Sequence, residues 1–123
     1  MELELRSLIK DRSGLPSTNV NWGLLPTNST YPAITMHIIG EDGNQTNKGP
    51  SSLGERVVQI DIWSKAFVDT LILRDKVLQL DCYTNDEGIK GIFLSRSRQS
   101  EDTTDPNRPL YRYSLDMRIL FDK

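Results

Sequence analysis

The side chains that most often carry chemistry in proteins are scarce in this chain. It has one histidine, His37, and one cysteine, Cys82, so a zinc site of the usual composition is not expected. His37 falls on the less apolar face of a predicted strand, which does not favour a general base or a metal ligand. Cys82 follows the acidic Asp81 and has no cationic neighbour in the sequence to activate its thiol, so we expect it to be a small buried hydrophobe.

Two further patterns have the outline of a site but not its spacing. The segment 49–54, Gly-Pro-Ser-Ser-Leu-Gly, lacks the spacing and the strand-to-helix context of a nucleophile elbow. The carboxylates of Asp81, Asp86 and Glu87 could hold a cation weakly, although a solvated turn is the better interpretation. The sequence contains no phosphate-binding loop and no dinucleotide fingerprint. It therefore predicts no enzyme, no metal site and no cofactor.

The charge balance does not favour a protein that reads nucleic acid. Lysine and arginine together number 15, against 17 aspartates and glutamates, which gives a net charge of −2. DNA-binding domains usually have a clear basic excess. The row formed by Arg112, Asp116 and Arg118 on the last predicted strand could pair across strands with Asp61, or it could form a charged surface in an assembly.

The length of 123 residues predicts a single domain over residues 1–123. One cysteine excludes an intramolecular disulfide and makes a stapled secreted scaffold unfavourable. No apolar run reaches the roughly 18 residues of a membrane span. The first five residues are acidic where a signal peptide would be basic. The sequence therefore favours a protein made and kept in a cytoplasm, without a membrane partner.

Hydrophobic periodicity predicts two helices and four strands. The helices are expected at 2–12 and 65–80, and the strands at 33–39, 56–63, 91–97 and 110–121. An irregular connector is expected at 15–31, and polar loops at 40–54 and 99–109. Ser64 is expected to be the N-cap of the second helix. The predicted fold is α+β, an antiparallel sheet of about four strands with both helices packed on its apolar face.

The second predicted helix is apolar on two sides. The stripe expected to face the core consists of Phe67, Val68, Leu71 and Leu78. The other stripe consists of Leu73, Val77 and Leu80. Either the N-terminal helix or the connector covers this other stripe, or a neighbouring subunit does, because exposed apolar patches on small soluble proteins usually mark such contacts. Its three residues are therefore the candidate subunit interface.

Four features together give the chain a resemblance to a known family. A short helix begins the chain, and the segment 31–34, Tyr-Pro-Ala-Ile, opens the first strand. The segment 57–64, Val-Val-Gln-Ile-Asp-Ile-Trp-Ser, runs straight into a helix that contains Leu-Arg-Asp-Lys-Val at 73–77. The segment 111–118, Tyr-Arg-Tyr-Ser-Leu-Asp-Met-Arg, forms the closing strand. Over nearly its whole length the chain resembles the phage tail-completion family, the tail-terminator or tail-to-head joining proteins of long-tailed phages.

This resemblance implies a structural protein of the virion, assembled in the host cytoplasm and located at the tail–head interface. It implies a homo-oligomeric ring, typically a hexamer, that caps the finished tail tube and contacts the tail tube protein. The same ring would join a head-completion or neck protein and let DNA pass without sequence-specific binding. The loop residues that the resemblance makes candidates for contact with neighbouring rings or for lining the channel are Asn44, Gln45, Lys48, Glu101, Asp102 and Arg108.

Two other functions stay open at the level of the sequence. The chain could be another neck or head-completion protein of the same phage, because patterns of this kind do not separate neighbours within a tail. It could also be a small regulatory or binding module without enzymatic activity. A concentrated basic stripe would support a nucleic-acid-binding module, and the sequence does not display one.

Overall fold

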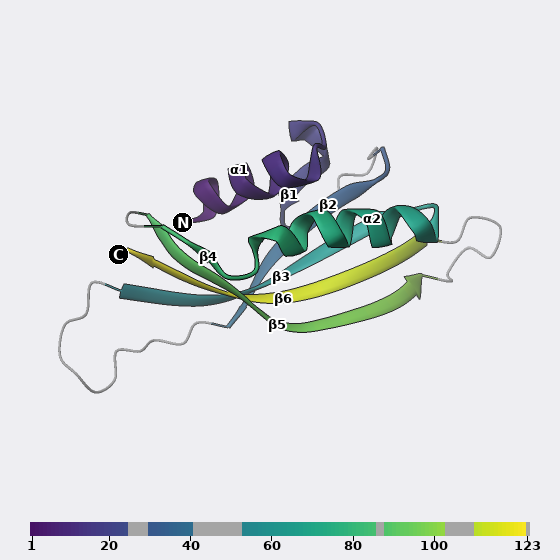
Figure 1. Cartoon of the computed structure of the whole chain (residues 1–123). Helices are drawn as coiled ribbons and strands as arrows, with labels where there is room; N and C mark the ends of the chain where they lie inside the picture. The colour runs from purple at the N-terminus through teal and green to yellow at the C-terminus, as the bar shows by residue number, and fades with distance from the viewer. Residues whose placement is uncertain (25–29, 41–52, 86–87, 103–109, 123) are drawn as a thin grey trace.

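The computed structural model describes residues 1–24, 30–40, 53–85, 88–102 and 110–122. Both α-helices lie on the same side of one sheet (Figure 1). The helical elements are α1 (Glu2–Ser13), η1 (Ser17–Asn19), α2 (Phe67–Val77) and η2 (Leu78–Leu80). The strands are β1 (Val20–Trp22), β2 (Ala33–Gly40), β3 (Leu53–Ser64), β4 (Tyr83–Thr84), β5 (Ile89–Asp102) and β6 (Leu110–Asp122). In the described part of the chain, no helix has the length and apolar character needed to cross a membrane.

The sheet has six strands in the order β1-β2-β3-β6-β5-β4 and is mixed. β1 pairs with β2 in parallel, and the remaining neighbours pair antiparallel. The prediction of an antiparallel sheet of about four strands is therefore wrong. The two strands it missed have three and two residues. Strands this short cannot show the alternation of apolar and polar residues on which the prediction depends.

The hydrophobic core lies between the sheet and the two helices. On β3 the buried apolar side chains alternate along the strand, at Val58, Ile60 and Ile62, and on β6 they do the same at Leu115, Met117 and Ile119. This alternation directs one face of each strand toward the helices. Leu5 and Ile9 of α1 belong to the same core cluster. The placement of both helices on the apolar face thus follows from the sequence pattern.

The junction between β3 and α2 differs from the predicted cap. β3 ends at Ser64 and the helix begins at Phe67, with Ala66 at the N-cap position. The Ser64 hydroxyl accepts a hydrogen bond from the backbone amide of Ala66 at 3.2 Å. Ser64 therefore lies two residues before the N-cap, and its hydroxyl stabilises the turn into the helix instead of the helix terminus.

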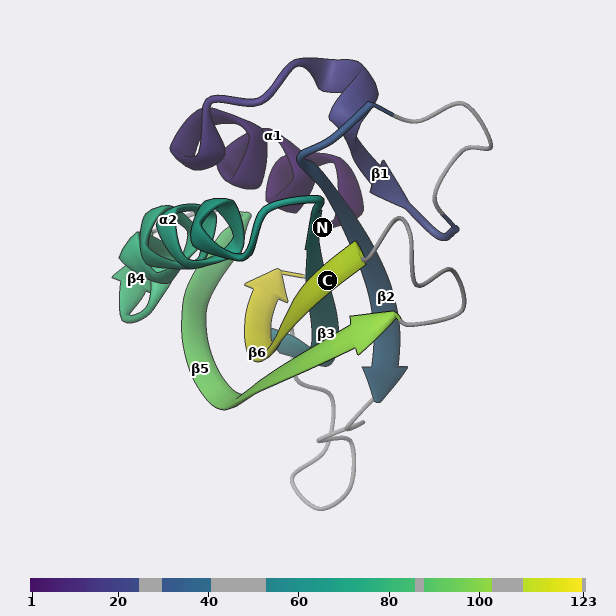
Figure 2. The ribbon, with the colours of Figure 1, turned by 90° about the vertical axis from the view of Figure 1, so that its right-hand side faces the viewer.

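β5 is longer than the predicted strand because two irregularities break its alternation. Its pairing with β6 shifts between Ile89 and Gly91 and again between Leu94 and Arg96. An extra residue at such a bulge reverses the sidedness of the residues that follow and bends the strand. Figure 2 shows β5 curving strongly along its length. The period-two pattern therefore ends near Leu94 although the strand continues to Asp102.

The connection between β1 and β2 is anchored by Asn19, which is buried. Its side-chain amide donates to the Thr30 hydroxyl at 3.1 Å and to the Pro32 carbonyl at 2.9 Å. The side-chain oxygen Oδ1 of Asn19 accepts from the Thr30 hydroxyl at 3.2 Å. These contacts hold residues 30–32 beside η1 and place β2 next to β1.

Replacing Asn19 with alanine is expected to lower the free energy of unfolding by about 1–3 kcal/mol, because the part-buried hydrogen bonds that its side chain makes to Thr30 and Pro32 are lost. Urea denaturation followed by circular dichroism measures this loss. Asn21→Ala is the matched control, since the exposed Asn21 amide makes one bond, to the Thr18 carbonyl at 2.9 Å. Equal losses in the two variants would show that Asn19 is not the anchor.

Candidate functional site

The fold does not bring together the residues that could do chemistry. His37 is half-buried on β2, and Cys82 is exposed, which corrects the expectation that its thiol is buried. The Cys82 backbone has a positive φ of 65° and donates to the Ile92 carbonyl at 2.8 Å, so the chain turns there and leaves the thiol outside the core. In the described ranges, no group of three or more His, Cys, Asp or Glu is placed to hold a metal ion.

Asp81 has a structural role at the edge of the sheet. Its carboxylate accepts a hydrogen bond from the backbone amide of Leu94 at 2.8 Å. Leu94 lies on β5 just beyond the stretch that pairs with β4. The carboxylate thus satisfies an amide of an otherwise open strand edge, a common way to keep edges from pairing with other chains. The other two acids of the predicted cation group, Asp86 and Glu87, lie outside the described residues.

The predicted subunit interface belongs to the core of the chain. Leu73, Val77 and Leu80 are all buried, in one cluster with Leu5 and Ile9 of α1. Helix α1 packs against both α2 and η2. The prediction that these three side chains meet a neighbouring subunit is therefore wrong, and the alternative that the N-terminal helix covers them is confirmed. The apolar pattern identified the stripe correctly but could not say which neighbour covers it.

The exposed apolar side of α2 carries different residues. The Val68 side chain is 61% exposed and Ile72 is 48% exposed, and the two lie one helical turn apart. Phe67, Leu71 and Leu78, which the sequence placed in the core-facing stripe with Val68, are only half-buried. The two stripes are thus exchanged relative to the prediction. We call Val68 and Ile72 the α2 patch, and their i, i+4 spacing is the sequence signal that would have found it.

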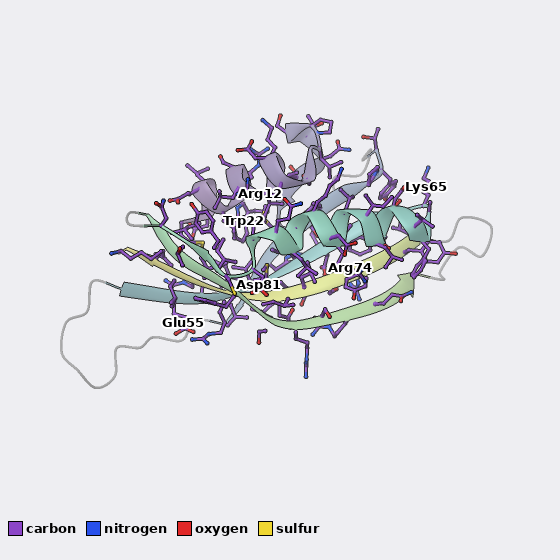
Figure 3. All side chains as sticks on the ribbon, viewed as in Figure 1. Arg12, Trp22, Glu55, Lys65, Arg74 and Asp81 are labelled. Carbon is purple, nitrogen blue, oxygen red and sulfur yellow. The ribbon has the colours of Figure 1, made fainter. Side chains whose placement is uncertain are left out.

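Aromatic and cationic side chains gather near the start of α2. The Lys65 ammonium lies 5.6 Å from the centre of the Tyr31 ring, and Phe67 meets Tyr111 edge-on at 5.8 Å. Figure 3 shows Lys65 at this end of the molecule, where β3 passes into α2. Aromatic residues are enriched at protein interfaces, because they bury a large area at low entropic cost. The α2 patch therefore continues into a surface suited to protein contact.

The structure describes only some of the predicted loop residues. Asn44, Gln45, Lys48 and Arg108 lie outside the described residues. Glu101 and Asp102 are part of β5, opposite Tyr111 and Leu110 of β6. The assignment of these two acids to a loop is therefore wrong, because the strand continues past the bulge at Leu94.

Arg74 links the outer side of α2 to the sheet. Its guanidinium lies 5.2 Å from the centre of the Tyr113 ring and donates to the Tyr113 hydroxyl at 3.5 Å. It also donates to the Asp75 carboxylate at 2.9 Å. Hydrogen bonding by Arg74, and secondarily by Ser97, lowers the pKa of Tyr113 below its ordinary value of 10.0. The Tyr113 and Asp75 hydrogen bonds in turn raise the pKa of Arg74, which stays a cation.

Replacing Arg74 with glutamine is expected to move the titration of Tyr113 to higher pH. A phenol whose pKa is lowered on folding adds stability above its unfolded pKa near 10, and this stability is lost as the pH falls through the folded pKa. The free energy of unfolding of the native protein should therefore exceed that of R74Q by more in the alkaline range than at neutral pH, as far as Tyr113 is concerned. Tyrosinate absorbance during alkaline titration measures the shift. In a Tyr113→Phe background R74Q should leave the titration unchanged, and a shift that persists there would assign it to another tyrosine.

The face of the sheet opposite the helices carries polar side chains that bond to one another across the strands. We call it the helix-free face; it is built from the odd-numbered residues of β3 and the even-numbered residues of β6. Asp61, Ser114 and Asp116 are buried on it although no helix covers it. The Asp61 carboxylate accepts hydrogen bonds from the Ser114 hydroxyl and from the Gln59 amide. Figure 3 shows Glu55, another buried acid, on the side of the sheet away from α1 and α2.

Ion pairs do cross the strands of this face, but with other partners than predicted. Asp116 pairs with Arg98 of β5 at 3.0 Å, and Arg118 pairs with Glu55 of β3 at 2.6 Å. The Arg112 guanidinium lies 5.3 Å from the centre of the Trp63 ring. Asp61, the predicted partner of the row, is bonded to neutral groups instead. The sequence pattern predicted which residues lie on this face. It did not predict how they pair, because pairing depends on the register between strands.

The comparisons with known proteins give a likeness in fold. No protein-family model and no curated protein matches the chain. The fold is similar to that of a chain in the solved structure titled "Virion of native gene transfer agent (GTA) particle", with a TM-score of 0.64. The match covers 97% of this chain and 84% of that chain, at 14% sequence identity. At this identity the two chains share an architecture, and the likeness by itself carries no activity.

Proposed function

We propose that this chain is a structural virion protein that assembles as a ring on the end of a phage tail tube and joins the tail to the head. The observation that carries the proposal is the similarity in fold, over almost the whole chain, to a chain of a virion particle. It agrees in direction with the resemblance of the sequence to tail-completion proteins. The proposed partners are further copies of the chain, the tail tube protein and a head-completion or neck protein.

The exposed apolar residues support assembly with other copies. A ring forms by head-to-tail contact, so it needs two different patches that fit each other on separate parts of the surface. The α2 patch supplies one. Ile38 and Ile39, which are 39% and 50% exposed at the end of β2, supply the other, and we call them the β2 patch. Figure 2 shows α2 and β2 on opposite flanks of the molecule, as a ring of this kind requires.

The proposed role is not catalytic. The polar side chains of the helix-free face are bonded to one another, with no buried side-chain nitrogen or oxygen lacking a partner among the described residues. In the proposed ring, DNA crosses the channel without being read.

The direct test is binding to purified phage tails that lack this component. Electron microscopy of tails mixed with the protein should show added density at one end only, at the end that meets the head. Light scattering on the protein alone gives its mass across concentration, and a hexamer would support the ring directly. Binding to isolated heads but not to tails would favour a neck or head-completion protein instead. A monomer that binds neither heads nor tails would contradict the proposal.

A further inference from the structure

Arginines and acids are interleaved on the helix-free face. By strand register this face includes four arginines and five carboxylates: Arg96, Arg98, Arg112, Arg118, Glu55, Asp61, Asp102, Asp116 and Asp122. The arginines of this open face therefore lie among a comparable number of acids. Arginine is the residue best suited to phosphate groups, because its planar fork matches two phosphate oxygens.

The fork of Arg98 is occupied from within the protein. One terminal nitrogen donates to Asp116 Oδ2 at 3.0 Å and the other to Asp116 Oδ1 at 3.2 Å. The second nitrogen also reaches over β6 to Gln59 Oε1 of β3 at 3.3 Å. The two carboxylate oxygens take the same positions on the fork that two phosphate oxygens would take. Arg98 of β5 is therefore held against the sheet by side chains of β6 and β3.

Among the described residues, Arg118 is held by a single hydrogen bond at the other end of the face. Its Nε donates to Glu55 Oε1 at 2.6 Å. In both pairs the arginine side chain is exposed, at 41% and 49%, while its acid is nearly buried, at 10% and 5%. The buried acids are fixed in place by the sheet, whereas the arginines would extend into solvent if they were released. The acids thus decide where the guanidinium groups point.

We infer that Asp116 and Glu55 act as internal phosphate substitutes that keep the helix-free face from gripping nucleic acid. Affinity for DNA comes mainly from cationic groups that contact phosphates and release counterions. Arg98, whose fork already holds a buried carboxylate, must break that pair before it can grip a phosphate, and Arg118 must give up its Nε bond to Glu55 to use its full fork. The arginines of this face therefore attract DNA phosphates less than unpaired arginines would. The inference goes beyond the proposed function, because it holds for the isolated chain whether or not a ring forms.

The test measures the binding of a mixed-sequence double-stranded DNA by fluorescence anisotropy at low salt. Asp116→Asn and Glu55→Gln keep the size of each side chain and remove its charge. Each is expected to bind DNA roughly tenfold more tightly than the native chain, with a salt slope steeper by about 0.9 for each arginine released. Adding Arg98→Gln to Asp116→Asn should return the affinity to the native level. Circular dichroism verifies the fold of each variant. If one variant does not fold, the other still tests the inference at its own site.

Asp75→Asn is the matched control, since Asp75 pairs with Arg74 at 2.9 Å on the helix side of the molecule. It removes one negative charge and releases one arginine, as Asp116→Asn does, but away from the helix-free face. A gain in affinity equal to that of Asp116→Asn would assign the effect to net charge and overturn the inference. So would unchanged binding in folded Asp116→Asn and Glu55→Gln. Arg98→Gln alone should not change binding, and a loss there would show that the fork of Arg98 is already available to phosphate.

Discussion

Replacing Leu80 with alanine is expected to lower the free energy of unfolding by about 3 kcal/mol, near the middle of the range for a buried leucine. Leu80 is fully buried at the end of η2, in the cluster that also holds Leu5 of α1. The truncation would leave a cavity between the N-terminal helix and the sheet. Because small domains are stable by only about 5–15 kcal/mol, Leu80→Asp should give a chain that does not fold. Urea denaturation followed by circular dichroism measures both variants.

The control for this prediction is Ile72→Ala, one of the exposed residues of α2. Because Ile72 is already 48% exposed, the cost of this substitution should stay below about 1 kcal/mol. A Leu80→Ala protein as stable as the native chain, but unable to self-associate, would return Leu80 to the subunit interface. The present packing predicts the opposite ranking.

The behaviour of α2 shows where hydrophobic periodicity stops being informative. The helix has two apolar stripes of similar size, and the pattern cannot rank them. In the folded chain the core side includes Thr70, which is fully buried and bonds its hydroxyl to the Phe67 carbonyl at 2.6 Å. A polar residue on the core side lowers the apparent hydrophobicity of that stripe. Val68, on the outer side, raises the apparent hydrophobicity of the other.

The sheet was predictable only where its alternation is long. β3 and β6 are paired from Ser64 opposite Tyr111 to Leu53 opposite Asp122. Their alternating stretches at 56–63 and 110–121 were found, whereas the start of β3 at Leu53 and Gly54 was assigned to a loop. β1 is set instead by contacts distant in sequence, such as the Trp22 indole nitrogen donating to the Glu2 carbonyl at 3.1 Å. No local pattern encodes such a contact.

The helix-free face was predictable in composition but not in arrangement. Arg98 and Asp116 are 18 residues apart, and their pairing follows from the bulge near Leu94 that sets the register of β5 against β6. A shift of one residue would place these side chains on opposite faces. The buried acids of this face could therefore be recognised as paired only once the register was known.

The double substitution Val68→Asp with Ile72→Asp is expected to abolish self-association and binding to tails while the fold is kept. Both side chains are largely exposed, so the free energy of unfolding should change by less than about 1 kcal/mol. A pair of carboxylates would be costly to bury against an apolar surface of another subunit. Light scattering measures association, and electron microscopy measures tail binding. The control is Leu3→Asp with Leu24→Asp, two residues that are 81% and 86% exposed, one on α1 and the other just after β1. This control should assemble normally, and its failure to do so would place the interface on the side of α1.

Mixing two blocked variants tests the head-to-tail geometry itself. A chain with Val68→Asp and Ile72→Asp keeps an intact β2 patch, and a chain with Ile38→Asp and Ile39→Asp keeps an intact α2 patch. Because each has one competent surface, neither should associate alone, but together they should form a dimer of one copy of each and nothing larger. Analytical ultracentrifugation at equal concentrations distinguishes these species. If either variant still dimerises with itself, the contact joins identical patches and the chain forms a two-fold dimer. If the mixture stays monomeric, the two patches do not meet each other, and the ring needs a different second surface.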